Sequence, residues 1–278
     1  MLRRIPLGKM NNLRDLGGYP AGDGVTVWER FLRGDNPAGL SEQDIQWLRE
    51  RDITTIVDLR SGEELARQPD QLRGQPGFLY HHCPLVGIEK LPNLEADIGR
   101  AYFEAMDRLT CVGRAMRILA AAPGGVLFHC TAGKDRTGIL AMLLLSLAGV
   151  AREDILADYQ ISETYLAEII QLIQLRVPDL AAFAGQSRRE YLEECMDLLL
   201  DKYGSVPDYL RAAGLTDGEL ETLRHKLLGE TQFKLDEAER LSTMLGLTMA
   251  ERDACFFDAE NRFSRSAVLE LPKRGKRQ

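Results

Sequence analysis

Ten residues, HCTAGKDRTG at positions 129–138, decide the fold of this chain because they separate an apolar strand from an apolar helix. The preceding run, Gly125-Val126-Leu127-Phe128, follows Pro123-Gly124 and predicts a short, buried parallel strand. From Ile139 to Val150 the residues are apolar almost all round, which predicts a buried helix. The order strand, tight loop, helix predicts an α/β domain with a mostly parallel central sheet flanked by helices.

The loop between this strand and this helix predicts an anion site. Backbone N–H groups at a helix start lack partners within the helix, and the helix dipole adds positive potential there. Gly133 lets the backbone curl, and the planar fork of Arg136 can hold two phosphate oxygens. The residues expected to surround a bound phosphate with Arg136 are Thr131, Ala132, Gly133, Lys134 and Thr137.

Cys130 is the candidate nucleophile of this loop. The positive helix end, with His129 and Arg136 nearby, favours its reactive thiolate form. A thiolate can take a phosphoryl group while Arg136 neutralises charge on a metaphosphate-like transition state. The hydroxyl of Thr137 could then donate to the sulfur, which makes the sulfur a better leaving group when water attacks the phosphocysteine.

The pattern H-C-x5-R-[ST] resembles the signature of the cysteine-based protein tyrosine phosphatase superfamily. HCTAGKDRTG is similar to its bacterial and fungal tyrosine/serine phosphatase branch, some members of which also cleave phosphoinositides. The resemblance extends upstream through NLRDLGGY at 12–19 and VDLRS at 57–61, and downstream to about Gly229. It implies a tyrosine or dual-specificity protein phosphatase that needs no metal and no cofactor.

Other functions fit the loop less well or leave the substrate open. An ATP-binding loop needs G-x4-G-K-[ST], but Phe128 stands at the first glycine position and Asp135 follows the lysine. A catalytically silent phosphate-binding module would lack the nucleophile or the arginine, and both are present. A phosphoinositide or small-molecule phosphate hydrolase remains an alternative, since Lys134 would suit a multiply phosphorylated head group.

A second β-branched strand, Ile53 to Leu59, is expected beside the catalytic strand. Because ligands bind beyond the carboxyl ends of parallel strands, Asp58 and Arg60 should lie near Cys130, and we expect Arg60 to contact substrate. Ser61 and Glu64 form a capping box, which we interpret as structural.

The general acid must overhang the loop opposite the nucleophile. Asp135 and Asp58 are the two candidates, and the family resemblance favours Asp135. The alternative for Asp135 is a salt bridge with Lys134 or Arg14 that shapes the loop.

Three further polar groups have open interpretations. Arg14 and Asp15 either lie near the catalytic loop or pair with each other and with turn backbone. Asp158 is interpreted mainly as a packing residue that could make contacts behind the site. His81 and Cys83 alternate on one face of a predicted strand, but no second pair of ligands completes a metal site there, so we expect them to be packing residues.

Composition limits the partners of the 278-residue chain. A net charge of −7 without a basic stripe argues against nucleic acid, so the expected partner is a phosphorylated protein or phosphoinositide substrate. Five scattered cysteines and a mechanism that needs a free thiol predict a reducing, cytoplasmic compartment, with non-classical secretion not excluded. The longest apolar run, 139–151, is too short to span a bilayer, so no membrane insertion is expected.

Two regions are expected along the chain. Residues 1–229 should form the phosphatase catalytic domain, with a helix at about 94–121 that has a break near Thr110. Residues 230–278 should form a helical C-terminal extension with a basic tail. Apolar positions at helical spacing in this extension need a surface to cover, through which a homo-oligomer could form.

Overall fold

The computed structural model describes residues 3–22, 24–88, 95–177, 183, 185–229, 243, 246 and 248. The chain divides into two compact units, residues 1–229 and 230–278. Apart from three single positions, the second unit lies outside the described residues, and with it the predicted C-terminal helices and their contact with a second subunit.

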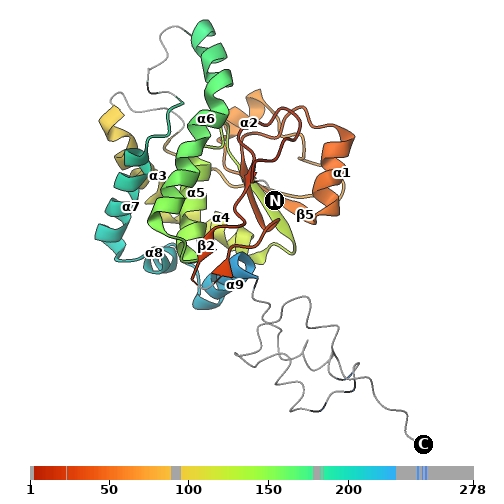
Figure 1. The fold of residues 1–278 in the computed structure, drawn as a ribbon, viewed down its shortest axis with the longest axis vertical. Helices are drawn as coiled ribbons and strands as arrows, with labels where there is room; N and C mark the ends of the chain where they lie inside the picture. Colours follow the sequence, from red (N-terminus) through yellow and green to blue (C-terminus); the bar gives the residue numbers. More distant parts are fainter. Residues whose placement is uncertain are drawn as a thin grey trace, which may run out of the picture. The chain divides into compact units, whose positions relative to one another are not determined.

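A five-stranded sheet lies at the centre of the first unit, with the strand order β1-β4-β7-β5-β6 (Figure 1). Strands β4, β7, β5 and β6 run parallel, and β1 pairs antiparallel with β4, so the predicted mostly parallel sheet is confirmed. The strands are β1 (Arg14–Asp15), β4 (Phe31–Gly34), β5 (Ile53–Asp58), β6 (Leu79–His82) and β7 (Gly125–His129), with β2 (Pro20–Ala21) and β3 (Gly24–Val25) as a separate pair.

The sheet is buried on both faces. In β7, Val126 and Phe128 pack into the larger core, whereas Leu127 packs into the smaller core on the other face. Successive strand residues point to opposite sides, so an unbroken apolar run is what a covered strand needs. Ile45 and Leu48 of α1 (Glu42–Glu50) cover the face with the smaller core.

Helices that follow residue 97 supply the larger core, and they lie together on the left of the sheet in Figure 1. The break in the predicted 94–121 helix is at Asp107 and Arg108, between α3 and α4, slightly earlier than expected. The remaining helices are α2 (Gly62–Arg67), the 3-10 turn η1 (Glu95–Asp97), α3 (Ile98–Met106), α4 (Leu109–Ala121), α5 (Asp135–Leu147), α6 (Arg152–Arg176), α7 (Arg189–Tyr203), α8 (Val206–Ala212) and α9 (Asp217–Leu228).

Helix α5 directly follows the catalytic loop and is the most deeply buried helix of this core. All its residues from Arg136 to Leu145 are buried, as the apolar run from Ile139 predicts. Each large apolar side chain removed from water contributes about 1.5–3 kcal/mol. The loop is therefore held between a buried strand and a buried helix, which fixes both of its ends.

Local signals in the sequence place several helix ends correctly. Capping boxes close the starts of α1 at Ser41, α2 at Ser61 and α9 at Thr216. Gly229 ends α9 in the left-handed conformation, with φ of 73°. Helix start and stop positions are local features, so they follow from residues that lie close together in the sequence, three apart in each capping box.

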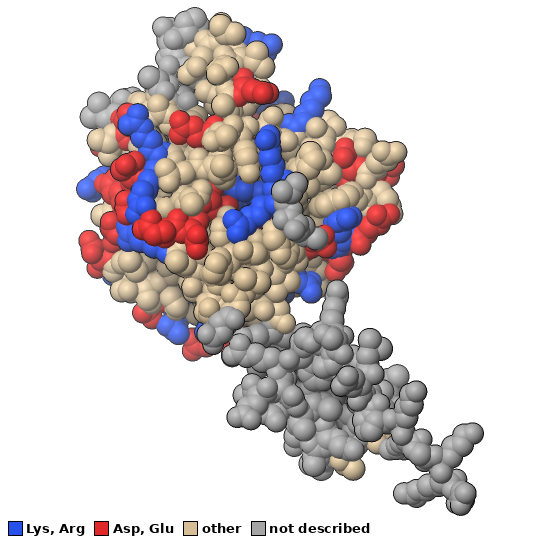
Figure 2. Space-filling model, viewed as in Figure 1, with Lys and Arg blue, Asp and Glu red and all other residues tan. Residues whose placement is uncertain are grey.

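Figure 2 shows acidic and basic side chains interspersed on the face formed by α7 and the start of α6. Arg152 pairs with Asp197 at 2.6 Å, and Arg189 pairs with Glu193 at 3.1 Å. In the part of the chain that the structure describes, no helix combines the length and apolar character needed to cross a membrane.

Candidate active site

The parallel strands bring three chain segments to one edge of the sheet. Register pairs Gly34 of β4 and Asp58 of β5 with His129 of β7, so all three strands end at one level. Cys130 follows β7 directly and is 1% exposed. The segments after β4 and β5 therefore flank the nucleophile, as the strand order requires.

The carbonyl groups of the catalytic loop are tied outward by neighbouring segments. The amide of Asn36 donates to the Thr131 carbonyl at 3.3 Å. The side-chain amide of Asn12 donates to the Ala132 carbonyl at 2.9 Å. These two bonds tie loop carbonyls to segments that precede the loop in the sequence.

Arg33 of β4 holds the next two carbonyls in the same way. Its Nη2 donates to the Gly133 carbonyl at 2.9 Å and to the Lys134 carbonyl at 3.4 Å. Among the residues that the structure describes, none accepts a hydrogen bond from the backbone amides of residues 131–136. A run of backbone N–H groups without protein acceptors at a helix start can serve as an anion cradle.

Gly133 is required by the geometry of this loop. Its φ is +68°, and a Cβ there would lie 2.4 Å from the carbonyl carbon of Gly34. Neither the conformation nor the space admits a side chain. The sequence-based interpretation of Gly133 as the position where the backbone curls agrees with this geometry.

Arg136 projects its guanidinium from the first turn of α5 toward Glu64 on α2. Its Nη1 and Nη2 donate to the two carboxylate oxygens of Glu64 at 2.6 and 2.7 Å, and Thr131 Oγ1 donates to the same carboxylate. Burial raises the pKa of Glu64, but these bonds outweigh burial and lower it to about 2. Arg136 Nε is buried and has no partner among the described residues. Both Nη groups of the fork, which were expected to hold phosphate oxygens, therefore bond Glu64, and Nε is the guanidinium N–H that has no partner among the described residues.

Asp135 begins α5 beside this cradle and is held by a tyrosine. The hydroxyl of Tyr102 donates to Asp135 Oδ1 and lies 2.9 Å from the hydroxyl of Tyr159. Burial and the Asp135 charge raise the pKa of Tyr102 well above its ordinary value, so Tyr102 stays a neutral donor. Lys134 Nζ lies 3.4 Å from the same Oδ1 and donates to the Gln186 carbonyl at 2.7 Å. The alternative partner for Asp135, Arg14, does not contact it and bonds Asp158 instead.

The model of the tyrosine phosphatase family matches residues 5–229. The chain belongs to the tyrosine phosphatase family. It is 31% identical over 218 residues to the tyrosine-protein phosphatase of Nostoc commune, covering 72% of this chain and 74% of that protein. It is 36% identical over 256 residues to the triple specificity protein phosphatase PtpB of Mycobacterium tuberculosis, covering 72% of this chain and 91% of PtpB. The chain is therefore a phosphoric monoester hydrolase of the protein tyrosine phosphatase class.

In this phosphatase, a buried ion triad anchors the catalytic loop from behind. Arg14 Nε lies 2.8 Å from Asp158 Oδ1, Arg33 Nη1 pairs with Asp158 Oδ2, and the Tyr19 hydroxyl donates to Oδ1 at 2.9 Å. Burial raises the pKa of Asp158, but the two guanidiniums outweigh it and hold that pKa well below its ordinary value. Asp15 instead accepts from the amides of Gly17 and Glu29. Arg14 therefore does lie behind the catalytic loop, and Asp15 shapes a turn.

Sequence reasoning missed the importance of Asp158 and Glu64. Asp158 was expected mainly to pack, but a carboxylate on the inward face of a helix needs buried partners, and that signal was available. The capping box of Ser61 and Glu64 is confirmed, with Ser61 N donating to Glu64 Oε2 at 2.8 Å. Its interpretation as purely structural was incomplete, because the same carboxylate also holds Arg136.

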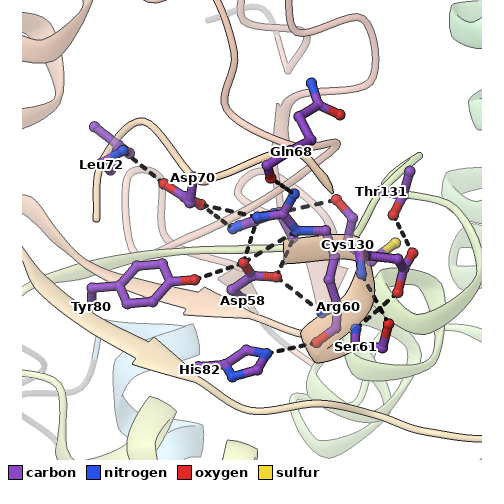
Figure 3. A network of polar contacts seen from close by, with 12 residues as sticks. Asp58, Arg60, Ser61, Gln68, Asp70, Leu72, Tyr80, His82, Cys130 and Thr131 are labelled. Atoms are coloured by element: carbon purple, nitrogen blue, oxygen red, sulfur yellow. Dashed lines mark hydrogen bonds and ion pairs between the residues drawn. The ribbon is translucent and has the colours of Figure 1, made fainter. Parts of the chain in front are cut away.

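Asp58 and Arg60 lie near the loop but bond to each other (Figure 3). Arg60 Nη2 lies 2.6 Å from Asp58 Oδ2, Nη1 donates to the Gln68 carbonyl at 2.7 Å, and Arg60 is 1% exposed. Burial raises the pKa of Asp58, but bonds from Arg60 and Tyr80 outweigh it and leave that pKa well below its ordinary value. This geometry favours neither a substrate contact for Arg60 nor a proton donor role for Asp58.

The metal-like pair His81 and Cys83 gains no further ligand. Within the described residues, the one group of three side chains that could hold a metal ion is Asp58, Asp70 and His129, and it contains neither His81 nor Cys83. The guanidinium of Arg60 already lies among the carboxylates of that group, 2.6 Å from Asp58 and 4.0 Å from Asp70.

Proposed function

We propose that this phosphatase hydrolyses phosphomonoesters through a phosphocysteine at Cys130, without a metal ion, and acts on phosphotyrosine in proteins. The observation that carries the proposal is that four successive loop carbonyls, 131–134, accept hydrogen bonds from other segments, while no described residue accepts from the loop amides, so those amides are available to a phosphate. Fixed dipoles of this kind stabilise charge that develops on a transferred phosphoryl group.

In the first step, the Cys130 thiolate attacks phosphorus while the bond from phosphorus to the leaving oxygen breaks. Loop amides and the Nε side of Arg136 hold the equatorial oxygens. Asp135 gives its proton to the leaving oxygen. Both Tyr102 and Lys134 contact Oδ1 of Asp135, so Oδ2 is the oxygen left to carry that proton.

In the second step, Asp135 takes a proton from water as the water oxygen attacks phosphorus. The bond between sulfur and phosphorus breaks, phosphate leaves and the Cys130 thiolate returns. Thr137 Oγ1 is buried and without a hydrogen-bond partner among the described residues, so it can donate to the departing sulfur.

Phosphotyrosine is the preferred substrate class in this proposal because the matched family model and the Nostoc relative are named for tyrosine phosphatase, while PtpB is named for triple specificity. The phosphoinositide alternative drew on Lys134 as a mobile charge at the rim. The Lys134 side chain is 5% exposed and bonds the Gln186 carbonyl and Asp135, so it is not a free rim charge in this structure.

The test is turnover of phosphotyrosyl and phosphoseryl peptides and of soluble inositol phosphates by the wild-type protein and by Cys130→Ser. We expect the fastest turnover with phosphotyrosine, unaffected by a chelator, and none by Cys130→Ser, which should still bind the peptide. Cys111→Ser is the matched control because Cys111 is a free, partly exposed thiol outside the loop. Turnover by Cys130→Ser near the wild-type rate would contradict the phosphocysteine, and a preference for inositol phosphates would contradict the substrate class.

A further inference from the structure

Beneath the catalytic loop, the ring of His129 lies against the carboxylate of Asp70. The His129 ring is fully buried, and its Nε2 lies 2.8 Å from Oδ2 of Asp70, which is also fully buried. Figure 3 shows Asp70 beside the Asp58 and Arg60 pair. The other oxygen of Asp70 accepts from the Leu72 amide at 2.7 Å, which fixes the carboxylate in place.

The second ring nitrogen of His129 faces the nucleophile residue. Nδ1 lies 3.3 Å from the backbone carbonyl oxygen of Cys130. A carbonyl and a carboxylate both attract a protonated ring nitrogen, and both ring nitrogens carry a proton only in the imidazolium form. The approach of Nε2 to Asp70 is oblique for a hydrogen bond, and neither atom bonds another described residue, so an ion pair is the interaction that their separation supports.

Charge balance in the cluster favours the same protonation state. The carboxylates of Asp58 and Asp70 carry two negative charges, and Arg60 supplies one positive charge between them. For these four side chains, an imidazolium at His129 gives a net charge of zero, whereas a neutral ring leaves one buried negative charge uncompensated. An uncompensated buried charge is strongly unfavourable.

We propose that Asp70 is a positioning residue that holds His129 as a buried imidazolium, with the positive end of the pair directed toward Cys130. The positive charge of the imidazolium then stabilises the Cys130 thiolate. This effect adds to that of Arg136 and the loop amides. Here we rely on the proposed function of Cys130 as the nucleophile. Asp70 itself does not touch the reacting atoms.

Several other titratable or charged groups face this pair or Cys130. They come from the ends of β4 and β5, from β6 and from α5, and they are Asp35, Asp58, Arg60, Tyr80 and Arg136. Of these, none contacts a ring nitrogen of His129 in the described part of the chain. Replacing Asp70 is thus the change that removes the counter-ion without disturbing the cradle.

The first measurement is made on the wild-type protein. Nitrogen-15 NMR of the full chain at pH 7 should show both ring nitrogens of His129 protonated. The chain has four histidines, and the signal is assigned by its absence in His129→Gln. A single protonated nitrogen on wild-type His129 at that pH would overturn the proposal.

The second measurement is the rate of Cys130 alkylation by iodoacetamide against pH. For Asp70→Asn, we expect the midpoint to move upward by about 0.5–1 pH unit, so that the rate below the midpoint falls about 3- to 10-fold. Asp217→Asn is the control, since its side chain is 81% exposed and pairs only with Arg211 among the described residues. An unchanged alkylation profile in a folded Asp70→Asn protein would also overturn the proposal.

Neither measurement depends on turnover. If wild-type His129 and Cys130 behave as expected but no phosphomonoester is hydrolysed, the proposed function fails and the role of Asp70 stands. If turnover is normal and His129 carries one proton, the proposed function stands and the role of Asp70 fails.

Discussion

Glu64→Gln tests how far the rate depends on the orientation of Arg136. Both carboxylate oxygens of Glu64 accept from the guanidinium, at 2.6 and 2.7 Å. Glutamine keeps one acceptor oxygen and loses the charge, so about one charge-assisted hydrogen bond is lost, worth about 1.5–3 kcal/mol. If that energy holds the fork in its productive orientation, kcat/KM should fall about 10- to 150-fold. The helix cap should survive, since the remaining oxygen can still accept from Ser61 N.

The assay is kcat/KM for p-nitrophenyl phosphate between pH 5 and 8. Because the pKa of Glu64 is lowered to about 2, its carboxylate is ionised throughout this range and the loss should be independent of pH. Glu63→Gln is the matched control, an exposed neighbour in the same helix turn. A Glu64→Gln enzyme with wild-type kcat/KM, or an equal loss in Glu63→Gln, would refute the reasoning.

Three further predictions concern the acid, the loop and its anchor. Asp135→Asn should slow phenyl phosphate much more than p-nitrophenyl phosphate, whose leaving group needs no proton, and flatten the basic limb of the pH profile; equal slowing of both would move the acid role elsewhere. Gly133→Ala places a Cβ 2.4 Å from the Gly34 backbone, so the Ki for inorganic phosphate should rise about tenfold or more, and an unchanged Ki would contradict the cradle. Asp158→Asn leaves two buried guanidiniums without their counter-ion and should cost about 3–5 kcal/mol in urea unfolding. The pKa of Asp158 is depressed in the folded state, so its ionised carboxylate stabilises the fold above about pH 4, and this stabilisation is lost as the pH falls further. The difference in unfolding free energy between wild type and Asp158→Asn should therefore become smaller in acid.

The chemistry of the loop was predictable because its parts are contiguous. Cys130, Gly133 and Arg136 lie within seven residues between a strand and a helix, and each has a role that its residue type limits. The capping boxes were predictable for the same reason, since their partners are three residues apart.

Contacts between distant segments were not predictable at residue level. Glu64 and Arg136 are 72 positions apart, and Arg14 and Asp158 are 144 positions apart. The strand order brings such residues close together, but the spacing of apolar residues in the sequence does not predict which carboxylate pairs with which guanidinium. Arg60 is an example. The sequence predicted its position at the sheet edge correctly, but it predicted a contact with substrate, whereas Arg60 pairs with Asp58.

The triad of Arg14, Arg33 and Asp158 also sets the order in which the enzyme can become active during synthesis. A nascent chain released only as far as α5 already carries Cys130 and Arg136, but Arg14 and Arg33 then lack their shared carboxylate. Arg33, which holds the Gly133 and Lys134 carbonyls, is not itself fixed by Asp158 until α6 has left the ribosome and docked. Phosphatase activity should therefore appear late in translation, after residue 158, rather than with the emergence of the nucleophile.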